Sequence, residues 1–262
     1  MKKILLSLFL SLLFCQTVSA TDYCADSNSK GAWYFDEASG SPQDCTSNNN
    51  DGTISGTVTQ NVSGQFNKAV QFTQQNNAQI NSGSAASLDN LATMSIVVWF
   101  DIDGAGSASG HSANGVIVSK GGRTKLLQCN GATNFRFTHE WEEPAASRGI
   151  WDSNTAPLST SAGYQHVAVT FNNSSASNNP VFYVNGSSVT FGESSSPSGS
   201  GARLDASGNF LIGLDNVDTG ELNGKLDELL YYNGILTSTQ INDIKDNGLT
   251  AAAAARRAGL AS

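Results

Sequence analysis

Short apolar runs that alternate with clusters of glycine, asparagine and serine make up most of the chain. The runs are rich in β-branched and aromatic residues and are bounded by turn-forming residues, which is typical of a β-sandwich or β-barrel. We predict strands at residues 31–35, 52–55, 69–72, 78–81, 94–102, 116–119, 126–129, 135–139, 164–171, 181–184, 188–191, 210–213 and 222–232. The pattern therefore predicts an all-β fold.

Two stretches predict their local structure sharply. Residues 163–171 alternate between an apolar face, which ends at Phe171, and a mixed face that contains His166, as in a half-buried strand. The dipeptide Asn185-Gly186 separates two apolar runs. Because both residues accept a positive φ, it predicts a tight hairpin turn.

One short helix is predicted near the C-terminal end of the chain. Thr237 is a suitable N-cap, Gln240 completes a capping box, and Leu236 and Ile241 occupy the two hydrophobic-staple positions. Gly248 can end the helix in a left-handed conformation.

The N-terminal residues resemble an export signal. Lys2 and Lys3 precede an apolar run at 4–14, and small residues at 18 and 20 complete a cleavage site. The apolar run is shorter than the roughly 20 residues that span a bilayer. We therefore predict a secretory signal peptide at 1–20 that is cut after Ala20.

The cysteines that follow the signal fit an oxidising compartment. Cys24 and Cys45 flank the first predicted strand, so their pairing in a disulfide is the simplest arrangement outside the cell. Cys129 is then left over, and we expect a buried free thiol in a strand.

Residues 21–249 are expected to form one domain, followed by an alanine-rich tail at 250–262. The net charge of −8 becomes about −10 without Lys2 and Lys3. Such an acidic surface argues against nucleic acid, against anionic lipid and against capture of acidic polysaccharide by charge alone. No second apolar stretch resembles a membrane span, so we expect no membrane insertion and a secreted, periplasmic or extracellular location.

Several motifs occur in an ordered set. They are GAWYFDEASG at 31–40, MSIVVWF at 94–100, VSKG at 118–121, YQHVAVTF at 164–171, FYVNG at 182–186 and GKLDELLYYNGIL at 224–236. The set resembles the laminin-G-like, concanavalin A-like jelly-roll family of secreted bacterial proteins. The resemblance implies a two-sheet antiparallel jelly-roll sandwich with one short C-terminal helix.

The resemblance also implies a function, because such domains mostly bind carbohydrate or protein. We expect a secreted glycan-binding module. One alternative is a protein-binding domain for adhesion or surface assembly, and another is a polysaccharide lyase or glycoside hydrolase with an atypical site.

The candidate glycan site lies in a polar segment around two tryptophans. Trp141 and Trp151 could form a flat platform for a sugar ring, with Glu142 and Arg148 as hydrogen-bonding neighbours. The alternative is that both indoles seal the edge of the sandwich.

Catalytic residues are harder to find. Hydrolysis of a glycosidic bond needs two carboxylates about 5 to 9 Å apart, and only Glu140 and Glu142 suggest such a pair. A solvated acidic loop explains this pair as well, so we assign no catalytic residue.

Finally, the resemblance implies a structural calcium, since in this family the first and last strands each offer an acidic residue at one edge. Asp36 and Asp227 hold these positions, and Asp44 and Asn50 lie in the polar loop between the early strands. Carboxylates, carbonyls and water suffice to coordinate calcium.

Overall fold

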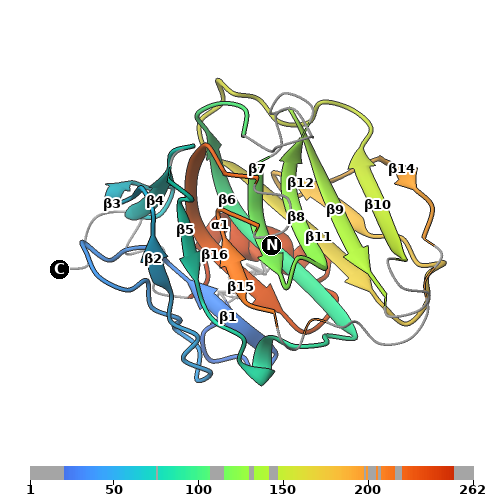
Figure 1. The fold of residues 1–262 in the computed structure, drawn as a ribbon, viewed down its shortest axis with the longest axis horizontal. Coiled ribbons are helices and arrows are strands. Elements are labelled where there is room, and N and C mark those ends of the chain that lie inside the picture. Colours follow the sequence, from blue (N-terminus) through green and yellow to red (C-terminus); the bar gives the residue numbers. More distant parts are fainter. Residues whose placement is uncertain are drawn as a thin grey trace, which may run out of the picture.

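The computed structural model describes residues 21–74, 76–106, 115–129, 133–141, 147–197, 199, 205, 208–215 and 220–250. Two antiparallel sheets pack face to face (Figure 1). One large apolar core lies between them. The predicted fold class, an antiparallel two-sheet sandwich with a single short α-helix in the described ranges, is confirmed.

The first sheet, sheet A, is built around two long central strands, β6 (Thr93–Ile102) and β16 (Gly224–Tyr232). In order from one edge, its path is β13 (Ser187–Val189), β12 (Val181–Val184), β11 (Gln165–Asn172), β6, β16, β4 (Lys68–Phe72) and β3 (Val58–Ser63). β1 (Ser29–Trp33) pairs with the second half of β16, beyond the part that pairs with β4.

The second sheet, sheet B, carries the candidate site. Its order is β14 (Phe191–Ser195), β10 (Arg148–Ser153), β9 (Asn134–Glu140), β8 (Thr124–Cys129), β7 (Gly115–Lys120), β15 (Phe210–Ile212), β5 (Gln79–Asn81) and β2 (Thr53–Ser55). A 3₁₀ turn at Ala86–Leu88 leads from β5 toward β6.

The core follows from strand alternation. On β11, Val167, Val169 and Phe171 point between the sheets, as the pattern predicts, whereas Ala168 points away and packs in a separate cluster. Since side chains alternate along a strand, each sheet has an inner face toward the core and an outer face directed away from the other sheet.

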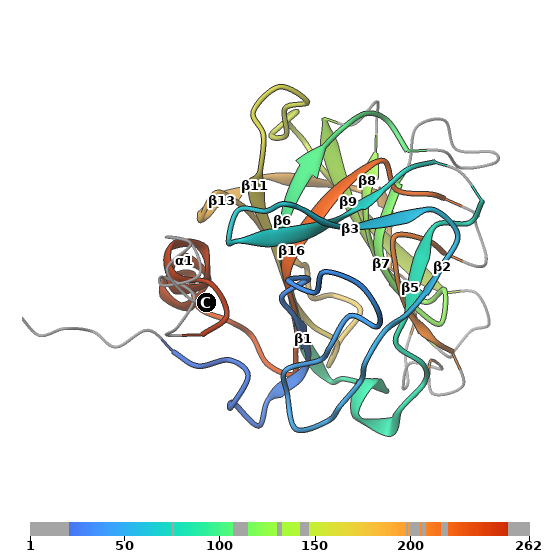
Figure 2. The same ribbon diagram turned by 90° about the vertical axis from the view of Figure 1, so that its left-hand side faces the viewer.

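The helix α1 (Ser238–Asn247) lies on the outer face of sheet A (Figure 2). Its capping box is formed as predicted, because Thr237 Oγ1 accepts a hydrogen bond from the Gln240 backbone N–H and the Gln240 side chain accepts from the Thr237 N–H. Ile241 and Ile244 pack against outward residues of the central strands. Gly248 ends the helix with a φ of 74°.

Other local predictions fare differently. The Asn185-Gly186 turn joins β12 to β13 with positive φ at both residues, which confirms the hairpin. The sequence pattern missed β3 and β10, which are short and largely polar. It also predicted one strand at 188–191, whereas the chain there leaves sheet A after β13 and enters sheet B as β14.

Cys24 and Cys45 form the predicted disulfide, with their Cα atoms 5.3 Å apart. Cys129 is a free and buried cysteine, also as predicted. Near the disulfide, the Tyr23 N–H donates to the Leu249 carbonyl at 2.8 Å. The described residues nearest to both ends of the chain therefore lie side by side.

Candidate functional site: a charged strip on the outer face of sheet B

Charged and polar side chains gather on the outer face of β9, β10 and β14. We call this group the outer charged strip and define it as Arg136, Glu140, Arg148, Asp152 and Ser194. Alternation explains most of its placement, because the odd-numbered residues of β9 point into the core and leave Arg136 and Glu140 outside. β10 behaves in the same way, with Trp151 inside and Arg148 and Asp152 outside.

Trp151 fixes which face of β10 is buried. Its indole folds back over Gly149, and a Cβ on that glycine would lie 2.1 Å from the ring. The same G-x-W arrangement recurs at Gly31 and Trp33, where the gap would be 2.2 Å. Only glycine leaves room for this close approach, so Gly149 helps to hold Asp152 on the outer face.

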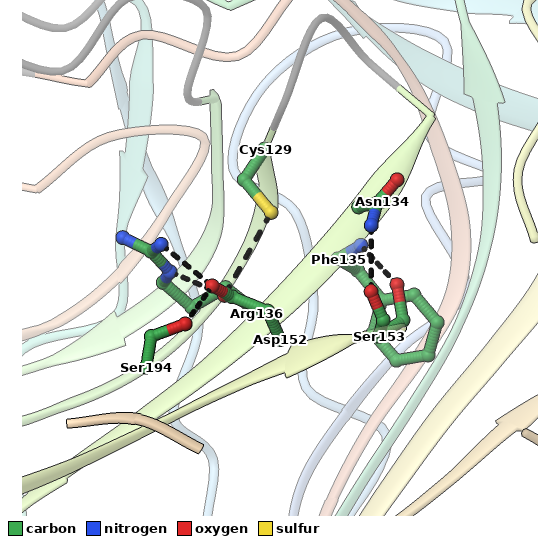
Figure 3. A network of polar contacts seen from close by, with 7 residues as sticks. All are labelled: Cys129, Asn134, Phe135, Arg136, Asp152, Ser153 and Ser194. Carbon is green, nitrogen blue, oxygen red and sulfur yellow. Dashed lines mark hydrogen bonds and ion pairs between the residues drawn. The ribbon is translucent and has the colours of Figure 1, made fainter. Parts of the chain in front are cut away.

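The centre of the strip is an ion pair between neighbouring strands. Arg136 lies opposite Asp152 in the β9–β10 register. Its Nε donates to Oδ1 at 2.5 Å and its Nη2 donates to Oδ2 at 2.8 Å, and Ser194 Oγ also donates to Oδ2 (Figure 3). Although burial opposes it, hydrogen bonds from Arg136 and Ser194 hold the pKa of Asp152 below its ordinary value.

Cys129 lies against this ion pair but is not a reactive thiol. Its Sγ is 3.9 Å from Asp152 Oδ1 (Figure 3). Burial, and secondarily the negative charge of Asp152, raises the pKa of Cys129 to about 12. Because the thiolate is the nucleophile, the group is chemically quiet at neutral pH.

At the other end of the strip, Glu140 and Arg148 lie opposite each other in the same register. Glu140 makes an ion pair with Arg123, from the turn between β7 and β8. Arg148 is exposed, and the described part of the chain holds no carboxylate in an ion pair with it. Glu142 lies outside the described residues, so neither its predicted ligand contact nor a carboxylate pair with Glu140 is placed.

The tryptophan platform predicted from the sequence is wrong. Trp141 is 3% exposed and Trp151 is 0% exposed. Trp141 packs against His139 and Trp151, and Gly199 lies directly over it. Both indoles belong to the main core, so the alternative, that they seal the sandwich, is what the structure shows.

The four predicted calcium ligands fall into two separate groups. Asp44 serves the loop after β1: its Oδ1 accepts from the backbone N–H groups of Ala32 and Thr46, and its Oδ2 accepts from Thr46 Oγ1 and the Asn50 N–H. The Asn50 carbonyl accepts from Trp33 Nε1, and its Nδ2 donates to the Lys30 carbonyl. These contacts organise the loop with the protein's own donors and acceptors.

Asp36 and Asp227, by contrast, meet at the turn between β3 and β4. Asp227 Oδ2 accepts from the Phe66 N–H at 2.8 Å, and Asp36 Oδ1 accepts from the Lys68 N–H at 3.0 Å. Gly64 makes room, since a Cβ there would lie 2.7 Å from Asp227 Oδ2. Asp227 Oδ1 is buried and has no hydrogen-bond partner in the described structure.

A bulge in β16 brings a further carboxylate, that of Glu228, close to Asp227. The register with β6 shifts between Asp227 and Leu230, and Glu228 has a φ of 52°. Burial, and then the charge of Glu228, raises the pKa of Asp227 well above its ordinary value. Within the described ranges no cluster of three or more His, Cys, Asp or Glu side chains is arranged to hold a metal. Of the four predicted ligands, Asp227 is the one with a buried side-chain oxygen that lacks a hydrogen-bond partner among the described residues.

A row of buried polar groups continues across sheet A. His166 and Asp227 are the cross-strand partners of Trp99 on its two sides. The imidazole is T-shaped to the indole at 5.1 Å between ring centroids, and burial lowers the pKa of His166 to about 3. Trp99 Nε1 and both His166 ring nitrogens lack hydrogen-bond partners among the described residues. His166 is therefore a neutral, packed histidine.

The sequence alone did not single out Arg136 or Ser194 as site residues. The alternation of N-F-R-F-T-H-E in β9 contained a signal for Arg136, and the G-x-W pattern of β10 contained one for Asp152. Their pairing, however, depends on the register between two strands. The alternation within each strand restricts that register to the pairings that keep one face buried, and it does not by itself choose among them.

Membrane-spanning helices are absent from the described ranges, since none of the helices there is both long and apolar enough. A family profile described as the Concanavalin A-like lectin/glucanases superfamily, Laminin_G_3, matches residues 72–242. The chain therefore belongs to this family. No protein with a curated description matches the sequence.

Solved structures share the fold. The binding domain of Paraclostridial Mosquitocidal Protein 1 is 12% identical with a TM-score of 0.62 over 84% of this chain and 52% of that one. Domain 4 of AbnA, a GH43 extracellular arabinanase from Geobacillus stearothermophilus solved with arabinotriose, is 19% identical with a TM-score of 0.58 over 83% and 98%.

The binding domain of Botulinum Neurotoxin DC, solved with SialylT, is 12% identical with a TM-score of 0.56 over 84% and 52%. The chain thus spans about half the length of the two toxin domains. At such low identities these similarities show a common jelly-roll fold alone.

Proposed function

We propose that this chain is a secreted glycan-binding module whose ligand binds at the outer charged strip. The observation that carries the proposal is the Arg136–Asp152 ion pair, which holds two charged groups at fixed positions on a partly exposed sheet face. An arginine–carboxylate pair that two neighbouring strands hold in place presents polar groups at fixed positions. Such groups are suited to fix the orientation of a hydroxyl-rich ligand.

The fold supports a binding role in general. Structures of the same fold include modules solved with arabinotriose and with SialylT. The Cys24–Cys45 disulfide fits the oxidising environment outside the cytoplasm. Domain 4 of AbnA matches this chain over 98% of that domain's own length.

A structural calcium is part of the proposal, at Asp36 and Asp227. Asp227 Oδ1 has no hydrogen-bond donor among the described residues, and two neighbouring acids raise the cost of ionising this carboxyl. A bound cation would neutralise the charge and hold the β3–β4 turn against β16. Water would supply most of the six to eight oxygen ligands that calcium takes.

A glycan array with the secreted protein tests the main proposal. We expect binding to at least one glycan class, reduced tenfold or more by Asp152→Asn and by Arg136→Gln. Asp246→Asn and Lys245→Gln, which change charges on α1 behind the other sheet, serve as matched controls and should bind as the wild type does. Absence of binding across the array, or equal effects of strip and control variants, would contradict the proposal.

A further inference from the structure

Three of the six arginines of this acidic protein lie close together in the described structure. The described residues include Arg123, Arg136 and Arg148, and all three lie at the outer charged strip or pair with it. The whole chain carries a net charge of −8. Two guanidinium groups on one sheet face, with a third reaching it from the β7–β8 turn, are therefore a local departure from the net negative charge of the chain.

The strip offers more hydrogen-bond donors than acceptors. Both oxygens of Asp152 already accept, from Arg136, Ser194 and the Cys129 thiol. A guanidinium has five N–H donors, and Arg136 uses two of them on Asp152. A ligand that satisfies the strip must therefore supply acceptors.

Arg148 is the arginine of the strip whose N–H donors are most accessible to a ligand. It begins β10, is exposed, and forms no ion pair with any described carboxylate. Ile150 lies between Arg148 and Asp152 on the same face and is partly exposed. Alternate residues of a strand are about 6–7 Å apart, so one sugar ring can cover Ile150 and reach both charged neighbours.

Stacking on tryptophan is not available as the main source of affinity. The chain has four tryptophans, and the most exposed of them, Trp99, is only 7% exposed and lies on the outer face of the other sheet. Polar contacts must then orient the sugar. A planar carboxylate is the acceptor group that matches an arginine fork in two parallel hydrogen bonds.

We propose, on the basis of the function proposed above, that the ligand is a glycan that carries a carboxylate, as uronic acids do, and that Arg148 binds this carboxylate. The sugar ring covers Ile150, and its hydroxyl groups accept from the free N–H groups of Arg136. Because the net charge of the protein repels a polyanion at long range, recognition acts at contact distance, within a Debye length of about 8 Å.

The test compares each acidic oligosaccharide with its own neutral form. Oligomers of galacturonate, glucuronate, mannuronate and guluronate are titrated by calorimetry beside carboxyl-reduced oligomers of the same length. We expect at least one acidic oligomer to bind tenfold or more tightly than its reduced form. Arg148→Gln should remove this preference while keeping the weaker affinity for the reduced oligomer, and Arg148→Lys should restore part of it.

Lys245→Gln is the matched control, because it removes a positive charge from α1. Equal affinity for acidic and reduced forms overturns the inference, as does an acidic preference that survives Arg148→Gln. Equal binding of neutral and acidic glycans that is lost in Asp152→Asn would leave the glycan-binding function standing while refuting the acidic ligand. Absence of any glycan binding would refute both.

Discussion

Arg136 and Asp152 come from neighbouring strands and join through two parallel hydrogen bonds on the outer face of sheet B. Both side chains are more than four-fifths buried, at 19% and 15% exposed. Hydrogen bonds to charged groups are stronger than neutral ones. This pair therefore both stabilises the β9–β10 contact and gives the strip a fixed geometry.

Replacing Asp152 tests both roles. Asp152→Asn keeps the shape but loses the charge, so we expect stability to fall by about 1 kcal/mol, measured by urea unfolding at neutral pH. Ser194→Ala removes one donor to the same carboxylate and should have a smaller effect. A larger loss from Ser194→Ala than from Asp152→Asn would contradict this ranking.

His166 should make the fold sensitive to acid. Its pKa falls from 6.5 to about 3 on folding, so the unfolded chain binds a proton more readily than the native protein. This contribution to stability is complete above pH 6.5 and declines as the pH falls from 6.5 toward 3, with a slope of up to about 1.4 kcal/mol per pH unit.

We expect His166→Phe to flatten this part of the stability profile, measured by urea unfolding at several values between pH 7 and pH 4. His139 is also buried, but it is hydrogen-bonded to Thr124 and Asn173. It is present in both proteins, so the difference between their stability profiles reports on His166 alone. Parallel profiles for wild type and variant would show that His166 does not titrate in this range.

Asp227 should have the opposite effect on the pH dependence of stability, lowering stability as the pH rises. Its pKa is raised on folding, so its contribution is most favourable at low pH, where both states are protonated, and is lost as the pH rises through the folded value. In the absence of calcium, Asp227→Asn should therefore stabilise the fold at pH 7 by a few degrees in the unfolding midpoint, and by less at pH 4.

If the proposed cation site exists, calcium should stabilise the wild type and so offset the advantage of Asp227→Asn at pH 7. Excess calcium should then raise the midpoint of the wild type relative to EGTA and leave Asp227→Asn unchanged. Asp44→Asn is a control, because the Asp44 carboxylate is engaged by its own loop, and it should keep the calcium response. A wild type that does not respond to calcium would exclude the site.

The cysteines give a chemical prediction. Cys24 and Cys45 are 21 residues apart, and closing a loop of this length stabilises the fold by about 3 kcal/mol. Cys45→Ser should lower stability by roughly this amount, measured by urea unfolding. Cys129 should resist iodoacetamide in the native protein and react after unfolding, which peptide mapping detects. Rapid labelling of Cys129 in the native state would contradict the thiol pKa of about 12.

How much of this the sequence predicts depends on the range of each interaction. The α1 capping box, the Asn185-Gly186 turn and the alternation of β11 were all predictable. Each depends on residues within a few positions of one another, through hydrogen-bond geometry, allowed φ values and the two-residue period of a strand. The disulfide was predictable from compartment and spacing alone.

Tertiary structure decided the rest. Trp141 and Trp151 were expected at the surface because polar residues flank them, yet they lie in the core. Asp44 and Asp227 were expected to share one ion, yet they serve two separate turns. Arg136 meets Asp152 only because β9 and β10 pair in one register. Register and burial depend on packing the whole core at once, so residues distant in sequence set them.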